Sequence, residues 1–485
     1  MSSGSEAGQS SNRNGSWGGG VARSTREAGQ CPQREGAAQG NASGEGNTAA
    51  PEADATVSTK LAGLVARARK EACLTNVMQY VDEELLRLAF RSLRKGAAPG
   101  VDGQSYEAYA EQLDQNLRDL YDRLKTGRYR APAVRRVYIP KEAGGQRPLG
   151  ISTVEDRVVQ KAVAWVLGAV YEQDFLDCSH GFRPGRSAHT ALHQLREGMM
   201  QHGVRAVVEV DVVGFFDHVQ HDWVRQFLRH RVNDGGLLRL VGKWLAAGVM
   251  EHGVVTRTPD GVPQGGPVSP VLSNIYLHYV LDLWFARRFK RQCRRWAGLT
   301  RYADDWVAVF EDPEDAVRFR AAVEERLERF GLQVAPAKTV VRCFDRTLAQ
   351  GNGRPRQRPE TFTFLGFTHF LAKTRRGGWH VGRTPSVQSR ERFLRRIAVW
   401  LKANRHRPVR EQQAYLRRAL NGYYQYFGLR LCLARLSGVH QRVRWLWKRA
   451  LQRRSQRARR RTDWATLHAA PWFQLPQPRL TQTWV

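Results

Sequence analysis

The sequence predicts an α+β fold in which an antiparallel sheet is backed by helices, and an all-helical part follows it. Two stretches predict the sheet. Residues 205–216 are typical of a core strand, and residues 299–310 are typical of two short strands around a tight turn. Helical periodicity between these stretches, and without interruption beyond about residue 373, predicts the helices.

The first 57 residues are expected to be disordered. They are mainly Gly, Ser, Ala, Asn, Gln and Glu, with hardly an apolar side chain beyond Trp17 and Val21. Such a segment cannot bury enough surface to offset the loss of chain entropy, and it lacks the apolar run of a secretory signal. The longest apolar run, at 162–171, is about half of the ~20 residues that cross a bilayer. We therefore expect a cytoplasmic protein with no membrane partner.

Residues 58–372 are expected to alternate helices with strands. A leucine stripe indicates a helix that ends before Gly127, Ser187 is a good N-cap for a helix that runs to Gly203, and Asp312 and Pro313 begin a further helix. In order, the expected elements are a helix at 113–126, a strand ending at Pro140, helices at 154–175 and 188–203, the core strand, the hairpin, a helix at 313–330 and a strand or hairpin at 361–370.

The net charge of +32 points to a polyanionic partner. Between Lys373 and Arg461 there are 26 Lys and Arg residues, and the only acids are Glu391 and Glu411. A membrane surface is the alternative partner, but tryptophans interleaved with arginines at 443–461 favour nucleic acid. Six cysteines are scattered without a C-x-x-C pair, which argues against a zinc ribbon or a disulfide framework and favours free buried thiols.

An adjacent pair of acids, Asp304 and Asp305, lies at the expected turn of the hairpin. An Asp pair can simply mark a solvated turn. Two like charges about 4 Å apart nevertheless repel by roughly 4 kcal/mol at a dielectric constant near 20, which favours a bound cation. If the strand that carries Asp211 is a neighbour, three carboxylates converge, and two Mg²⁺ ions held by such acids are the usual centre for displacement at phosphorus. Asp217 is either a further member or a surface acid.

The chain resembles group II intron-encoded reverse transcriptases and maturases over nearly all of residues 58–450. The matching stretches, in chain order, are RRVYIPKEAGGQRPLGISTVEDRVVQ, HGFRPGRSAHTAL, VDVVGFFDHVQHDW, GVPQGGPVSPVLSNIYLHYVLD, RYADDWV, GLQVAPAKT, FTFLGF and LNGYYQYFG. The resemblance implies that Asp211 and Asp304 bind the metal ions directly, that the Val212 carbonyl assists, and that Asp305 completes the site.

The resemblance also implies roles around the incoming nucleotide. Lys141 and Arg147 are similar to residues that grip the triphosphate, and Phe216 to the aromatic that blocks a ribose 2′-hydroxyl. Gln264 is similar to a residue that positions nucleotide and template, and Lys338 to the acid that protonates pyrophosphate. Taken singly, Phe216 could be an ordinary core residue, the cations could be solvated surface charges, and Gln264 could cap a turn.

For the domains, the resemblance implies a right-hand polymerase. Fingers and palm would span 58–372, a helical thumb or maturase domain 373–450, and a basic tail 451–485 that is a remnant of a DNA-binding region without an endonuclease. Trp445 and Trp447 could stack on bases or pack between helices.

The implied function is an RNA-directed DNA polymerase that copies intron RNA and assists its splicing and mobility. Its partners would be intron RNA, an RNA template with a DNA primer, deoxynucleoside triphosphates and target DNA. The alternatives are a domesticated or defence-related reverse transcriptase without an intron, and a noncatalytic RNA-splicing factor; the three intact acids speak against the latter.

Overall fold

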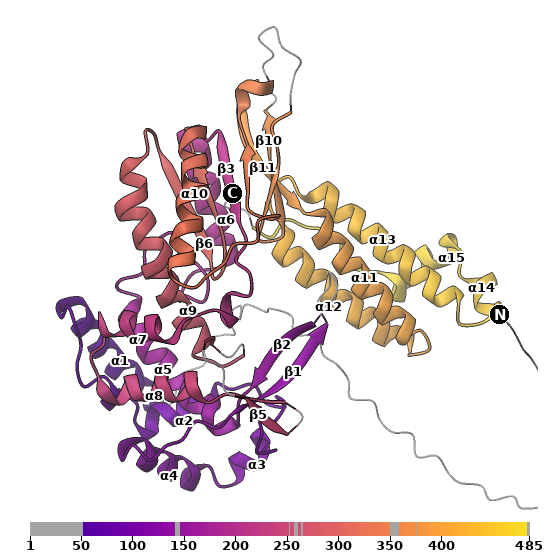
Figure 1. Cartoon of the computed structure of the whole chain (residues 1–485). Helices are drawn as coiled ribbons and strands as arrows, with labels where there is room; N and C mark the ends of the chain where they lie inside the picture. The colour runs from indigo at the N-terminus through magenta and orange to yellow at the C-terminus, as the bar shows by residue number, and fades with distance from the viewer. Residues whose placement is uncertain are drawn as a thin grey trace, which may run out of the picture. The chain divides into compact units, whose positions relative to one another are not determined.

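The computed structural model describes residues 52–140, 146–251, 253–256, 260–262, 265–349, 358–374 and 376–482, all within one compact unit, Thr48–Val485 (Figure 1). Most of the segment expected to be disordered, 1–51, lies outside these residues. Helix α1 (Glu52–Lys70) already begins before residue 57, so the predicted boundary was wrong. No helix in the described ranges is both long and apolar enough to cross a membrane.

The first layer is helical. Side chains of Asp82, Ser105 and Thr153 accept hydrogen bonds from backbone N–H groups in the first turns of α2, α3 and α5, which fixes where these helices begin. The helices are α2 (Glu83–Arg91), α3 (Tyr106–Glu111), α4 (Leu113–Lys125) and α5 (Val154–Tyr171). Almost the whole of α5 is buried, as its apolar sequence predicts.

A small sheet follows α4. Strands β1 (Val134–Pro140) and β2 (Gln146–Ile151) are antiparallel, β4 (Val249–Glu251) pairs with β1 in parallel, and β5 (Val254–Thr256) completes the order β2-β1-β4-β5. The prediction of one strand ending at Pro140 is confirmed, but it has more partners than the sequence indicates.

The central sheet has the order β6-β7-β3-β8 and is antiparallel throughout. Its strands are β3 (Ala206–Val210), β6 (Ala297–Tyr302), β7 (Asp305–Phe310) and β8 (Val340–Cys343). The helices around it are α6 (Ala188–His202), α7 (His221–Arg229), α8 (Gly235–Ala246), α9 (Ser269–Leu277) and α10 (Pro313–Arg329). Caps at Ser187 and Asp312 confirm the two predicted helix starts.

The two faces of the central sheet belong to different apolar cores. Val208 and Phe310 pack with Phe319 of α10 in one core, while Val207 and Val309 face the other. This alternation is the two-residue period of a strand that is covered on both faces. The sheet is therefore held between two layers, and its strand ends are fixed in place.

A three-stranded sheet, β9 (Phe362–Phe364), β10 (Phe367–Lys373) and β11 (Trp379–Pro385), joins the central sheet to the C-terminal helices. Figure 1 shows β10 and β11 side by side. The expectation that the chain is all-helical beyond about 373 is wrong here, because β11 pairs with β10 along its whole length and the helices begin only at Val387.

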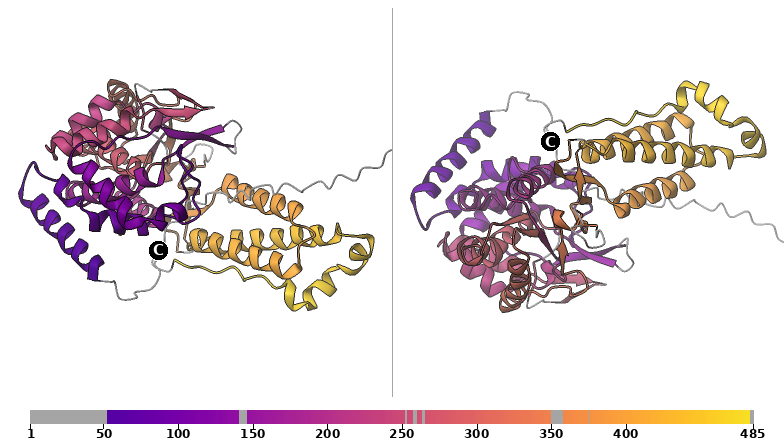
Figure 2. Two further views of the ribbon diagram at one scale, coloured as in Figure 1. Left: turned by 90° about the horizontal axis from the view of Figure 1, so that it is seen from below. Right: turned by 90° about the horizontal axis from the view of Figure 1, so that it is seen from above.

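The C-terminal helices α11 (Val387–Ala403), α12 (Val409–Phe427) and α13 (Leu433–Gln452) lie side by side (Figure 2). The short helices α14 (Gln456–Arg461) and α15 (Trp464–Ala469) follow. Leu467, Phe473 and Leu475 are buried in the same core as α12 and α13. Part of the expected basic tail, from Leu467 to Leu475, therefore packs on the C-terminal helices.

Candidate active site

Three acids meet at one end of the central sheet. The β3–β7 ladder runs to the pair Val210 and Trp306, so the next step of the same register sets Asp211 opposite Asp305. Opposed residues in an antiparallel ladder have Cα atoms about 4.5–5.5 Å apart. Asp304 lies in the two-residue turn between β6 and β7, beside the Tyr302 and Asp305 pair. The register therefore leads Asp211 and the Asp304–Asp305 turn to the same end of the sheet, and their joint role as metal ligands stays a prediction.

The turn itself is tightly held. Ala303 has a φ of 57°, the left-handed region that disfavours any residue with a Cβ. Gly181 packs against it so closely that an added Cβ would lie 2.4 Å from the Ala303 nitrogen. Only glycine fits at 181, and the loop that contains it helps to keep the turn in this unusual conformation.

Arg301 supports the β6–β7 hairpin from the interior of the protein. Its side chain is fully buried and pairs with the equally buried Asp282 through two hydrogen bonds of 2.8 and 2.6 Å. The remaining donors bond Asn274 Oδ1 at 2.9 Å, Ser179 Oγ at 2.8 Å and the Ala303 carbonyl at 3.1 Å. All five guanidinium N–H groups therefore have acceptors, one of them in the turn that carries Asp304.

The acids perturb one another. Part of Asp305 is exposed to solvent, but its carboxylate is surrounded by protein atoms. This loss of solvation, together with the neighbouring charges of Asp304 and Asp211, raises the pKa of Asp305 to about 7. A backbone hydrogen bond from Leu365 opposes the rise in the pKa of Asp305. A bound cation would remove the cost of this mutual repulsion.

Asp211 is held by the segment between α10 and β8. Its carbonyl accepts a hydrogen bond from Ala335 N at 2.7 Å, and its carboxylate accepts one from Lys338 Nζ at 2.6 Å. Val212 forms a bridge with Val334 in which the hydrogen bonds belong to the flanking residues. The Val212 carbonyl consequently points away from Val334, to the other side of its strand.

The β6–β7 hairpin is linked to helix α12 through Leu365, in the turn between β9 and β10. Tyr426 of α12 donates a hydrogen bond from its hydroxyl to the Leu365 carbonyl at 2.9 Å, and its own carbonyl bonds His189 Nε2 at 2.8 Å. Since the Leu365 backbone also bonds Asp305, one short chain of contacts joins α12 to this acid. This link could not be predicted from local sequence patterns, because the residues are far apart along the chain.

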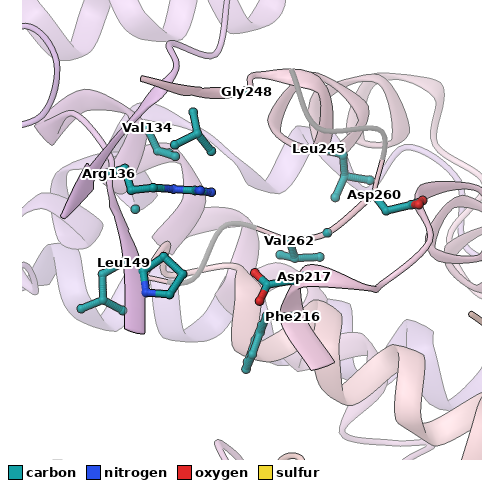
Figure 3. A pocket seen from close by; sticks show the side chains of 13 residues that line it. Val134, Arg136, Leu149, Phe216, Asp217, Leu245, Gly248, Asp260 and Val262 are labelled. Carbon is teal, nitrogen blue, oxygen red and sulfur yellow. The ribbon is translucent and has the colours of Figure 1, made fainter. Parts of the chain in front are cut away.

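Phe216 lines a cavity of about 280 Å³ and is half-buried, with its side chain packed against the edge of the core (Figure 3). Its carbonyl accepts a hydrogen bond from Val262 N at 2.7 Å, which ties it to the loop beside it. Arg136 of β1 and the exposed Asp217 line the same cavity, as Figure 3 shows. The cavity therefore lies between the β1–β2 sheet and the segment that follows β3.

Three predicted nucleotide-binding groups cannot be placed. Lys141 and Gln264 lie outside the described residues, and so does the side chain of Arg147, although its backbone belongs to β2. The glycines next to Gln264 are described. A Cβ on Gly265 would lie 2.5 Å from the Gly150 carbonyl oxygen, so this loop packs directly on β2.

The two tryptophans of the basic region differ. Trp447 is fully buried and donates to Gln412 Oε1 at 2.8 Å, so the packing alternative is confirmed for it. Trp445 is half-buried, with the guanidinium groups of Arg442 and Arg449 centred 4.0 and 4.6 Å from its ring.

The donor atoms at the end of the central sheet are all oxygens. Within the described ranges, no group of three or more His, Cys, Asp or Glu side chains is arranged to hold a metal ion on its own. The donors at the sheet end, three carboxylates and the Val212 carbonyl, are nevertheless all hard oxygens, the type that Mg²⁺ prefers. Mg²⁺ also keeps waters and takes oxygens from bound phosphates, so these residues fit it without forming a closed cage.

Comparisons with known proteins agree with this chemistry. Residues 139–369 match the family model described as reverse transcriptase (RNA-dependent DNA polymerase). The chain is 36% identical over 244 residues to Protein YkfC of Escherichia coli. This match covers 44% of this chain and 64% of YkfC.

Two proteins encoded in introns are also similar. The group II intron-encoded protein LtrA of Lactococcus lactis subsp. cremoris is 37% identical over 228 residues, covering 43% of this chain and 37% of LtrA. The COX1/OXI3 intron 1 protein of Saccharomyces cerevisiae is 28% identical over 325 residues, covering 57% of this chain and 38% of that protein. The matched parts thus span less than two thirds of these relatives.

Proposed function

We propose that this chain, of which residues 139–369 match the reverse transcriptase family model and are similar to group II intron-encoded proteins, is an RNA-directed DNA polymerase and maturase. The observation that supports the proposal is the register of β3 and β7, whose last pair, Val210 and Trp306, directly adjoins Asp211 on one strand and Asp305 on the other. All three acids lie inside the matched region.

In this proposal, Asp211, Asp304, Asp305 and the Val212 carbonyl hold two Mg²⁺ ions. The ions would activate the primer hydroxyl and neutralise the leaving pyrophosphate. The chain's own contribution is geometric. The Arg301 network and Gly181 fix the turn of Asp304, and Ala335 holds the backbone of Asp211, so the carboxylates need little rearrangement when the substrate binds.

The cavity beside Phe216 would receive the incoming deoxynucleotide. The half-buried ring would occupy the space that a ribose 2′-hydroxyl needs. Lys141, Arg147 and Gln264 would bind the triphosphate and align the template. Lys338 Nζ lies 2.6 Å from Asp211 Oδ2. The Lys338 ammonium would give a proton to the departing pyrophosphate.

The α11–α13 helices would act as the thumb. Their arginines would bind the primer–template backbone and intron RNA through phosphate contacts, so RNA affinity would fall steeply with salt. In the same division, residues 58–372 are fingers and palm, and 451–485 contribute further nucleic-acid contacts. Help with splicing and intron mobility is inferred from the similarity to intron-encoded proteins.

Primer extension tests the proposal. A DNA primer annealed to an RNA template is incubated with Mg²⁺, deoxynucleotides and one of three proteins. These are the wild-type chain, the Asp304→Ala variant and the Asp222→Ala variant. Asp222 is a highly exposed acid on α7, so its loss is the control for one removed charge. We expect Asp304→Ala to abolish extension while its affinity for RNA stays within a few-fold of the wild type. Asp222→Ala should extend the primer normally. Extension by Asp304→Ala would remove the assignment.

A further inference from the structure

A cleft lies between α13 and α15, on a part of the chain outside the reverse transcriptase domain. Its volume is about 560 Å³, larger than the cavity beside Phe216. Residues of α13 form one wall, and Trp464 and His468 of α15 form the other. The residues that line it are Gly438, Gln441, Arg442, Arg444, Trp445, Trp464 and His468.

Cations in and around the cleft are braced against aromatic rings. The Arg442 guanidinium lies 4.0 Å from the ring centre of Trp445, and Lys448 Nζ lies 4.4 Å from that of Trp464. Arg444 lies 5.6 Å from the same Trp464 ring. Cation–π contacts of this kind hold long side chains in place, so their charges are directed before a ligand arrives.

Among the residues that the structure describes, no acid lines the cleft. Asp463, which precedes α15, uses its side chain to accept the Thr466 N–H at 2.7 Å and so caps the helix. Trp464 keeps 37% of its surface exposed, so part of its indole is accessible from solvent. The cleft thus combines fixed positive charge with an accessible flat ring.

We propose that this cleft binds single-stranded nucleic acid, with an unpaired base stacked on Trp464 and the adjoining phosphates bound by Arg442 and Arg444. Stacking of a base on an aromatic ring, beside arginines that follow the backbone, is how single strands are bound without regard to sequence. An acidic peptide would use the charges but would leave both indoles without a function. The proposal rests on the nucleic-acid contacts proposed above for α11–α13 and residues 451–485, and it adds a base-stacking site that primer extension does not test.

Photocrosslinking of the full chain tests the site. Twelve-residue strands of uridine or deoxyuridine, each carrying one 5-iodouracil, are bound at about 0.3 M salt, irradiated, and the crosslinked peptides are identified by mass spectrometry. We expect a crosslink at Trp464 or Trp445. The RNA and DNA strands show which sugar the cleft prefers. Crosslinks found only outside 438–468 would overturn the proposal.

Variants give the second readout, the dissociation constant of the same strands. Trp464→Ala should weaken binding about tenfold, Trp464→Phe should retain most of it, and Arg442→Ala should weaken it about threefold. Arg320→Ala on α10 removes one exposed charge elsewhere and should change binding by less than twofold. Equal effects of Arg320→Ala and Arg442→Ala, or displacement of the strands by polyglutamate as readily as by polyuridylate, would contradict a nucleic-acid site.

Discussion

Arg301 and Asp282 form a fully buried, two-bond ion pair directly beneath the hairpin that carries Asp304. Two buried charges are costly unless every donor is used, and here the spare donors reach Asn274, Ser179 and the Ala303 carbonyl. The pair therefore couples the interior of the protein to the conformation of the turn that carries Asp304.

Arg301→Lys should raise the Mg²⁺ concentration needed for half-maximal primer extension by about threefold or more. Lysine keeps the charge but cannot reach all of these acceptors, so the turn of Asp304 loses its support. Arg231→Lys is the matched control. Arg231 is also largely buried and bonds Asp174 at 2.6 Å, on a different part of the fold. Equal Mg²⁺ requirements in the two variants would show that Arg301 has only a structural role.

Phe216→Ala should let the enzyme incorporate ribonucleotides. The half-buried ring lines the cavity, and its removal opens the space that a 2′-hydroxyl would occupy. We expect the ratio of kcat/KM for deoxynucleotide over ribonucleotide to fall at least tenfold. Phe215→Leu, at the adjacent core position, should lower stability and leave this ratio unchanged. Unaltered sugar discrimination in Phe216→Ala would make Phe216 a packing residue only.

Lys338→Ala should lower kcat for nucleotide addition by roughly a hundredfold, the usual range for loss of a proton donor. The KM for the nucleotide should change little, because the proton is transferred in the chemical step. Single-turnover extension measures both values. If the KM rises and kcat is kept, Lys338 acts in binding and the general-acid role is wrong.

Acid should destabilise the fold through His369. Burial, with Arg383 nearby, lowers the pKa of His369 from 6.5 to about 3, so it is neutral in the folded protein. Below pH 6.5 the unfolded chain binds a proton that the folded chain does not, so this stability is lost as the pH falls from about 6.5 toward 3.

The replacement His369→Phe should reduce that acid sensitivity. His369 stacks on Phe362 with ring centres 4.6 Å apart, so phenylalanine suits the site. Between pH 6.5 and 5, we expect its free energy of unfolding, measured with urea, to fall by about 2 kcal/mol less than that of the wild type. The same pH dependence in both proteins would refute the assignment. His218→Phe, an exposed position, serves as the control.

The central hairpin could be predicted because its signals are local. Alternating apolar residues and an acid pair specify two strands and a turn, and Asp211 follows an unmistakable core strand. Arg301 could not be assigned a role from the sequence. Its acceptors come from Ser179, Asn274 and Asp282, and only the tertiary fold brings them to one point.

The boundary of the helical region was misjudged for a similar reason. The segment of β11 contains Gly382, Arg383 and Pro385, which are poor strand signals, and it becomes a strand because β10 supplies a complete ladder of partners. Likewise, the link from Tyr426 to Leu365 depends on how α12 packs on the β9–β10 turn. Such contacts are set by packing rather than by local propensity.

The central claim is that Asp211, Asp304 and Asp305 surround one divalent-metal site. Iron(II) bound in place of Mg²⁺, with ascorbate and peroxide, cuts the backbone beside the ion and so locates it directly. We predict cuts near residue 211 and near residues 304–305, suppressed by excess Mg²⁺ and reduced in Asp304→Asn. Cuts confined to other regions, or unaffected by Mg²⁺ and by that replacement, would contradict the account.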